Sequence, residues 1–156
     1  MIKVKKATTR DKEIVLHLLD VFRSFVLQLY NPASALVSKK AVTKGGPIFD
    51  LAISSDSGAI FLAQADDASV GILTIYLIPQ IRKGEYCAEI EEIFVKPEYH
   101  GKGVSSMLMA EAVNWAKSKN ANSIRLESGQ ELIRSHKFYE KYGFENYGKA
   151  YKFDLK

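Results

Sequence analysis

The sequence predicts one domain of the α/β (α+β) class over residues 1–156, with a mixed sheet and helices on both faces. Segments of β-forming residues alternate along the chain with segments whose apolar residues recur at helical spacing. The composition, 47% hydrophobic and 26% charged, is that of an ordinary globular protein. A chain of 156 residues can bury one substantial core, and no linker divides it.

The N-terminal part predicts a strand followed by a long helix. β-forming residues over 2–6 predict the strand. Thr8 or Thr9 can cap a helix that carries two carboxylates in its first turn, where negative charge is favourable. Asn31-Pro32 ends this helix. Its apolar residues at helical spacing are Val15, Leu18, Leu19, Phe22, Phe25, Val26 and Leu29.

Short helices and a hairpin are expected in the middle of the chain. Residues 33–47 are ambiguous and end in a Gly-Gly-Pro break. The hairpin turns at Asp66-Asp67. In order, the elements are an ambiguous helix over 33–42, a short helix over 49–53, strands over 59–63 and 69–78, and a polar connection over 79–86.

The C-terminal part predicts two further strand–helix pairs. Pro97 cannot donate to a ladder, so the first of these strands should end there. Gly143 occupies the position that closes a helix in the left-handed conformation. In order, the elements are a strand over 87–96, a helix over 103–120, a strand over 123–127, a helix over 131–142 and a last strand or hairpin over 144–155.

A glycine-rich turn, His100-Gly101-Lys102-Gly103, joins the strand before Pro97 to its helix. The glycines allow a tight turn and let backbone N–H groups approach a ligand. Free N–H groups and the positive end of the helix dipole meet at this point, which favours an anion such as phosphate. The P-loop motif is absent, and the third glycine of the dinucleotide fingerprint falls at Ser106. A purely structural turn is the alternative.

The motif V-x-P-x-x-x-G-x-G is followed by a helix, a strand and the segment FYEKYGF at 138–144. This combination resembles the GNAT superfamily, the general-control-related N-acetyltransferases, over the whole chain in element order. The resemblance implies a mostly antiparallel sheet and acetyl-CoA as co-substrate. It also implies that backbone amides of the turn receive the pyrophosphate and the preceding strand the pantetheine arm. The residues implied to bind the cofactor are Ile93, Phe94, Val95, His100, Gly101, Lys102, Gly103, Val104, Ser105, Ser106 and Tyr139.

Four positions depart from the family's pattern. Glu98 stands where Gln or Arg is expected, and His100 stands where Arg is common. Ser105 replaces a frequent third glycine, and Leu132 replaces a frequent cofactor-contacting Asn. A carboxylate near a pyrophosphate is unfavourable, so we expect Glu98 to weaken acetyl-CoA binding relative to a Glu98→Gln variant.

The resemblance places the general acid at Tyr139, because a phenol is neutral at working pH and can donate a hydrogen bond to the leaving thiolate. For the base, strand alternation puts Glu89 and Glu91 on one face, where two carboxylates that are partly desolvated raise one pKa. Glu91 is favoured and then Glu89, whereas a bulge would bring in Glu92. The alternatives are that Tyr139 is a core aromatic, that the carboxylates are solvated or ion-paired, and that water accepts the proton.

Charge and cysteine content narrow the partners and the compartment. The net charge of +4 and pI of about 9.0 suit an acidic ligand. Basic residues are not interleaved with aromatic ones in a dense patch, so no nucleic acid is expected. No apolar run approaches ~18 residues and no leader is apparent, so no membrane is expected. Cys87, the single cysteine, allows no disulfide and no Cys-based metal site, which favours a reducing, cytoplasmic location without a metal.

The function expected is transfer of the acetyl group of acetyl-CoA to a primary amine by direct attack. The alternatives are a non-catalytic acyl-CoA-binding sensor or regulatory module and a different nucleotide-binding domain. An acetyl group carried on Cys87 is disfavoured, because this residue has no evident catalytic partner. Polyamines, other small amines, an antibiotic or a protein amine stay open as acceptors, as does a homodimer. An acidic groove would favour a cationic amine.

Overall fold

The computed structural model describes residues 1–33 and 36–155. The chain divides into two compact units, Met1–Leu126 and Glu127–Lys156. Among the described residues, no helix is long and apolar enough to cross a membrane. A single domain over 1–156 remains a prediction.

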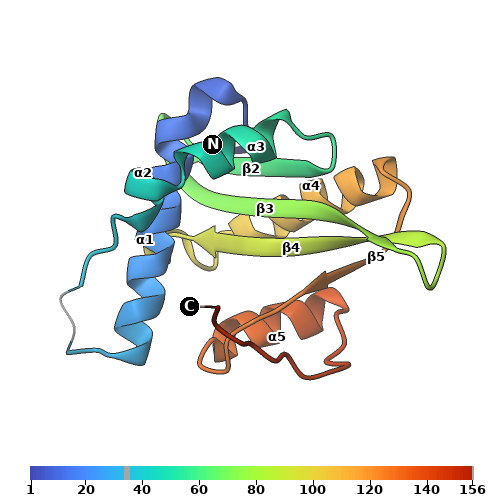
Figure 1. Ribbon diagram of the computed structural model, residues 1–156. Coiled ribbons are helices and arrows are strands. Elements are labelled where there is room, and N and C mark those ends of the chain that lie inside the picture. Colours follow the sequence, from blue (N-terminus) through green and yellow to red (C-terminus); the bar gives the residue numbers. More distant parts are fainter. Residues whose placement is uncertain (34–35, 156) are drawn as a thin grey trace. The chain divides into compact units, whose positions relative to one another are not determined.

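The first unit is built on a five-stranded sheet in the order β1-β2-β3-β4-β5 (Figure 1). Neighbouring strands from β1 to β4 pair antiparallel, whereas β4 and β5 pair parallel. This arrangement confirms the mixed, mostly antiparallel sheet. The strands are β1 (Ile2–Lys6), β2 (Gly58–Ala65), β3 (Ala68–Gln80), β4 (Glu85–Val95) and β5 (Ala121–Leu126).

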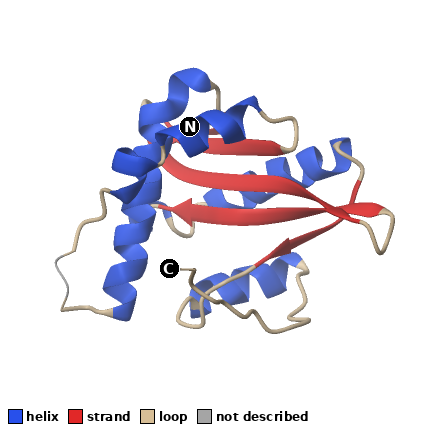
Figure 2. Cartoon of the chain, in the orientation of Figure 1, coloured by secondary structure: helices blue, strands red, loops and turns tan. Residues whose placement is uncertain are grey.

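Helices cover both faces of this sheet, as predicted (Figure 2). On one face, Phe22 of α1 stacks on Phe94 of β4 with ring centroids 5.1 Å apart. On the other face, a Cβ added to Gly71 of β3 would lie 3.2 Å from Leu108 of α4. The helices of this unit are α1 (Lys12–Tyr30), α2 (Lys40–Lys44), α3 (Gly46–Ser54) and α4 (Val104–Ser118), with single 3-10 turns at Thr9–Asp11 and Pro97–Tyr99.

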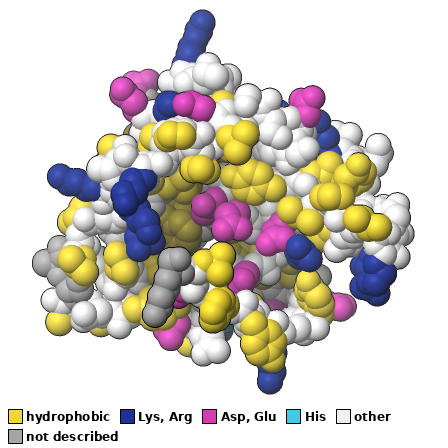
Figure 3. Space-filling view, viewed as in Figure 1, with side chains coloured by type: hydrophobic (Ala, Val, Ile, Leu, Met, Phe, Trp, Pro, Cys, Tyr) yellow, Lys and Arg dark blue, Asp and Glu magenta, His cyan; other side chains and the backbone are white. Residues whose placement is uncertain are grey.

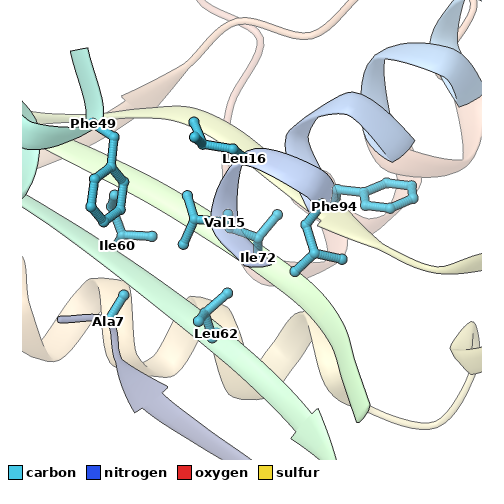
Figure 4. Close-up of a cluster of buried hydrophobic side chains, with 9 residues drawn as sticks. Ala7, Val15, Leu16, Phe49, Ile60, Leu62, Ile72 and Phe94 are labelled. Carbon is cyan, nitrogen blue, oxygen red and sulfur yellow. The ribbon is translucent and has the colours of Figure 1, made fainter. Parts of the chain in front are cut away.

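A buried cluster joins α1 and α3 to the sheet (Figure 4). Val15 and Leu18 of α1 are among the residues whose spacing predicted the helix, because the apolar stripe of an amphipathic helix must face the core, and Leu16 joins them. The cluster consists of Ala7, Val15, Leu16, Leu18, Phe49, Ile60, Leu62, Ile72 and Phe94.

The short helices differ from the prediction in their bounds. Of the ambiguous helix predicted over 33–42, only its last residues are helical, in α2 (Lys40–Lys44). Residues 34–35 lie outside the described part of the chain. Asp20 of α1 determines where α2 begins, since its carboxylate accepts hydrogen bonds from the N–H groups of Ala41 and Val42, both 2.9 Å.

The break expected at Gly45-Gly46-Pro47 is shorter than predicted, because only Gly45 separates α2 from α3. α3 begins at Gly46 and carries Pro47 in its first turn. Proline fits this position because the first N–H groups of a helix have no intrahelical acceptor.

The second unit contains α5 (Ile133–Tyr142), which Gly143 closes at φ +107°. This confirms the predicted closing glycine. The predicted last strand or hairpin over 144–155 is wrong, because these residues form neither helix nor strand. Their large apolar side chains alternate but stay exposed at Tyr147, Tyr151, Phe153 and Leu155. Alternation alone does not make a strand where no neighbouring strand pairs with it.

Candidate active site

The two edges of β4 are paired to different extents. Along one edge β4 pairs with β3 from Gln80↔Glu85 to Gly71↔Val95. Along the other edge its parallel ladder with β5 ends at the pair Ile90↔Leu126. Among the described residues, the segment 91–95 therefore has a strand partner on one side only. We call this segment the open edge of β4.

The open edge presents backbone groups at two residues. Lys96 donates its N–H to the carbonyl of Val70, 2.9 Å away, so Lys96 points toward β3. Backbone groups of an antiparallel strand alternate in direction. The N–H and C=O groups of Val95 and Ile93 consequently point away from β3. The N–H groups of Val95 and Ile93 and the C=O group of Ile93 are positions at which an extended, amide-bearing arm could add hydrogen bonds, whereas the C=O group of Val95 already bonds to His100 Nε2.

A glycine turn continues directly from the open edge into α4. Gly101 and Gly103 have φ values of +78° and +79°, and a Cβ added to either would meet nothing within 4 Å. Gly103 is the N-cap of α4 and supplies no side-chain cap, so the first N–H groups of the helix are available to a ligand. Open space, free N–H groups and the positive dipole end make this turn suitable for a pyrophosphate.

His100 ties this turn to the strand. Its Nε2 lies 2.7 Å from the carbonyl oxygen of Val95, and since a carbonyl only accepts, Nε2–H donates. Lys102 lies with its Nζ 4.8 Å from the centre of the Tyr99 ring. Glu98 is exposed on the 3-10 turn before His100. The proposed effect of Glu98 on acetyl-CoA affinity stays a prediction.

A β-bulge separates the paired half of β4 from the open edge. Thr74 of β3 pairs with Glu92, whereas the next residue, Ile75, pairs with Ile90, so Glu91 is the extra residue. Without a bulge, strand alternation would place the side chains of Ile90 and Glu92 on the same face of the sheet. This prediction is wrong. Cross-strand partners share a face, and the partners of Ile90 and Glu92, Ile75 and Thr74, are consecutive residues. Ile90 and Glu92 therefore lie on opposite faces, and Glu92 becomes a candidate for the base.

The three carboxylates of β4 have different surroundings. Glu89 forms an ion pair with Arg125 of β5, with Oε2 and Nη2 2.6 Å apart. Glu91 is exposed. Glu92 is half-buried and accepts a hydrogen bond from the Thr74 hydroxyl, while its own N–H donates to Thr74 Oγ1 at 3.1 Å. Figure 3 shows acidic side chains gathered over β3 and β4 with hydrophobic side chains around them.

Two groups beside the bulge have raised pKa values. Burial, and then the negative charge of Glu91, raise the pKa of Glu92 to about 7. Burial and the charges of Glu92 and Glu91 raise the pKa of Tyr76, whose phenol therefore stays neutral. A carboxyl group that titrates near neutral pH is suited to accept a proton from an ammonium group.

A cavity of about 110 Å³ adjoins Glu92 on the side of the sheet covered by α1 and α3. Its walls come from six elements of the first unit, α1, α2, α3, β2, β3 and β4, and from Gly45 between α2 and α3. The lining residues are Val15, Leu16, Leu19, Ala41, Gly45, Ile48, Phe49, Ala52, Ile60, Thr74, Tyr76 and Glu92.

In the second unit, Tyr139 lies half-buried on α5. Its ring meets those of Phe144 and Phe138 at centroid distances of 5.9 and 5.6 Å. Burial raises the pKa of Tyr139 to about 12, so the phenol is protonated at neutral pH. His136 Nε2 donates to the carbonyl of Gly129 at 2.9 Å, so this ring bonds to the backbone of the second unit.

The structure joins the predicted strand and turn residues into one continuous segment, from the open edge to the start of α4. It gives the three carboxylates different surroundings, whereas the sequence favoured Glu91, then Glu89, and Glu92 only in the case of a bulge. Thr74 and Tyr76 were missed, because they become neighbours of Glu92 only through the register of β3 with β4. The described residues contain no group of three or more His, Cys, Asp or Glu side chains placed to hold a metal ion.

Comparison with known proteins agrees with this geometry. Residues 24–144 match the Acetyltransferase (GNAT) family. The chain belongs to this family. The resemblance to the GNAT superfamily seen in the sequence is thereby confirmed.

Among similar GNAT proteins, an uncharacterized N-acetyltransferase of Methanocaldococcus jannaschii is 31% identical over 99 residues, which are 62% of this chain and 43% of that protein. Glucosamine 6-phosphate N-acetyltransferase of Trypanosoma brucei brucei is 29% identical over 97 residues, 62% of this chain and 64% of that protein. The chain thus spans less than two thirds of the length of these relatives.

A solved structure of a transcriptional regulator from Bacillus halodurans C-125 shares the fold. It superposes with a TM-score of 0.80 at 20% identity, and the match covers 99% of this chain and all of that one.

Proposed function

We propose that this GNAT protein transfers the acetyl group of acetyl-CoA to a primary amine by direct attack of the amine on the thioester. The observation that carries the proposal is the continuity of the open edge of β4 with the glycine turn. The edge offers backbone N–H and C=O groups to the amide-bearing pantetheine arm, and the turn offers N–H groups to the pyrophosphate. One segment thus matches both parts of the same co-substrate.

The chemistry needs a base, a polarised carbonyl and an acid. We propose Glu92 as the base, acting directly or through a water, because its raised pKa of about 7 suits proton transfer near neutral pH. Glu91 and Glu89 stay as predicted alternatives. Backbone N–H groups near Val95 polarise the thioester carbonyl.

The bonds change in a balanced order. The base takes one proton from the bound ammonium group, the resulting amine nitrogen bonds to the carbonyl carbon and gives its second proton to water, and the carbon–sulfur bond breaks. Tyr139 then gives its phenolic proton to the departing thiolate, as its neutral state at working pH permits. Water returns that proton to Tyr139 and removes the one held by the base.

The test is a CoA-release assay over a panel of amines, combined with calorimetric titration of acetyl-CoA. The panel contains simple alkylamines, spermidine and glucosamine 6-phosphate. The last is included because a relative of this chain is a glucosamine 6-phosphate N-acetyltransferase. Cys87 is buried, so a thiol reagent reports released CoA with little background from the protein. Amine-dependent release of CoA supports the proposal.

Two results would overturn it. Tight binding of acetyl-CoA without turnover over the whole panel favours a non-catalytic acyl-CoA-binding module. Binding of ATP or NAD in place of acetyl-CoA favours a different nucleotide-binding domain. A cytoplasmic location and a homodimer remain predictions that this assay does not address.

A further inference from the structure

The cavity beside Glu92 has one polar wall and one apolar wall. The sheet contributes its polar side chains, Thr74 and Tyr76 from β3 and Glu92 from β4. The helices contribute the apolar ones, including Leu16, Leu19 and Phe49, with Ile60 of β2 beside them. A ligand that fits such a cavity has one polar end and one hydrocarbon end.

The polar wall has space for a cation. Glu92 uses Oε2 for the hydrogen bond from Thr74, and within the described residues Oε1 has no partner. Of the residues that line the cavity, all of them in the described part of the chain, Glu92 alone is charged. An amine is therefore matched, whereas a phosphate or carboxylate on the acceptor would meet no Lys or Arg from this lining.

A second, larger cavity on the same helix does not offer this match. It lies between α1 and the segment 37–42 and reaches Phe94 and Pro97. Its one carboxylate, Asp20, already accepts hydrogen bonds from the Ser38 hydroxyl at 2.7 Å and from two N–H groups of α2. These bonds occupy both oxygens of Asp20, so an incoming ammonium group finds no free acceptor there.

The size of the cavity limits the hydrocarbon end. At about 110 Å³ it is somewhat smaller than an apolar cavity of about 150 Å³, which holds benzene. A branched alkyl group of about five carbons is the corresponding size. Ile48 lines the cavity but leaves 66% of its surface exposed, so it extends the apolar wall outward.

We propose that the acceptor is a small primary amine with a compact apolar substituent and no acidic group. Its nitrogen lies at Glu92 and its alkyl group packs against Leu16, Leu19 and Phe49. This inference rests on the proposed acetyl transfer for its catalytic meaning, but the binding it describes can be measured separately.

The first experiment compares kcat/KM for isoamylamine and ethylamine, which share the amine and differ in three carbons. Each methylene buried in an apolar site contributes about fourfold. We expect isoamylamine to exceed ethylamine at least about tenfold, and glucosamine 6-phosphate to be the poorest of the three. Equal values for the two alkylamines, or a preference for glucosamine 6-phosphate, overturn the inference.

Two variants change the cavity in opposite directions. Ala52→Leu narrows it and should remove most of the preference for isoamylamine over ethylamine. Leu19→Ala enlarges it and should move the preference toward cyclohexylmethylamine, so the inference remains testable if Ala52→Leu does not fold. Ala110→Leu, at an exposed position of α4, is the matched control and should leave the preference unchanged. A preference that neither cavity variant alters contradicts the inference.

Ligand-observed NMR separates the two proposals. Isoamylamine should bind the wild-type protein saturated with CoA, and Ala52→Leu should abolish that binding. Binding without turnover means that the proposed function fails while the ligand class stands. Turnover of other amines without binding of isoamylamine means that the ligand class fails while the proposed function stands.

Discussion

The two halves of β4 both carry carboxylates but have different environments. The half before the bulge, Glu85–Ile90, is paired with β3 on one side and β5 on the other. The half after it, segment 91–95, is paired with β3 alone among the described residues. Carboxylates lie in both halves, at Glu89 and at Glu92.

Strand pairing decides what each carboxylate can do. Because β5 continues to Leu126, its Arg125 lies beside Glu89 and forms an ion pair with it. Where β5 has ended, no cation among the described residues pairs with Glu92, which instead accepts a hydrogen bond from Thr74. The comparison teaches that the same residue type is a structural ion-pair partner in one half of a strand and a candidate base in the other.

The largest effect is expected from Glu92→Gln. The amide keeps the size of the side chain but accepts no proton, and a positioned base contributes about 100-fold or more. We expect kcat/KM for an amine acceptor to fall by about this factor, as measured by CoA release.

Glu89→Gln is the matched control in the paired half. It should retain activity within about threefold, since Glu89 is held in an ion pair with Arg125. The wild-type value of kcat/KM should also fall about tenfold per pH unit below the Glu92 pKa of about 7. A larger loss in Glu89→Gln or Glu91→Gln than in Glu92→Gln would reverse the assignment.

A smaller loss is expected from Tyr139→Phe. The departing thiolate needs a proton donor, and we propose Tyr139 for this role, because burial raises its pKa to about 12 and keeps the phenol neutral. We expect kcat to fall about tenfold or more while acetyl-CoA affinity is retained, because only the hydroxyl is removed. Pre-steady-state release of CoA measures this step, and unchanged kcat at every pH excludes Tyr139 as the acid.

The glycine turn after the open edge is tested by Gly103→Ala. Alanine at φ +79° is strained by about 1 kcal/mol, and its methyl group enters the open space above the turn. We expect the Kd for acetyl-CoA to rise about tenfold by calorimetry.

Gly84→Ala separates strain from ligand binding. Gly84 has φ +68° and equally open surroundings, but it lies in the turn that leads into the paired half of β4. We expect a similar loss of stability and an unchanged Kd. An equal change of Kd in both variants would mean that the glycine turn before α4 binds no part of acetyl-CoA.

The smallest effect concerns stability. The folded protein keeps the proton of Glu92 up to about pH 7, whereas the unfolded chain releases it near the ordinary value of 4.5. Between these values the folded state binds more protons, so the free energy of unfolding falls as pH rises. Glu92→Gln removes this loss, and its Tm should exceed that of the wild type by a few degrees at pH 8.

At pH 4 the Tm advantage of Glu92→Gln should disappear, since the carboxyl group is then protonated in the folded state and largely so in the unfolded one. Thermal unfolding at the two pH values measures the difference. An equal Tm difference at both would show that burial does not perturb Glu92.

Local sequence signals predicted most of the secondary structure. The helical spacing of Val15 and Leu18, the stop at Pro97 and the closing Gly143 all correspond to observed features. The errors arise where a distant residue decides. The start of α2 depends on Asp20 from α1, and the alternation over 144–155 has no paired strand to support it.

By itself, the sequence determined the GNAT fold class, the glycine turn and the segment that continues from strand to helix. These features follow from neighbouring residues, because turn conformation, helix start and strand propensity are local properties of the chain. Only the tertiary structure decided which carboxylate forms an ion pair and which bonds to Thr74, where β4 loses its second partner and what chemistry lines the cavity. Those outcomes depend on the register of β3 with β4, the end of β5 and the packing of α1 and α3, which no local pattern encodes.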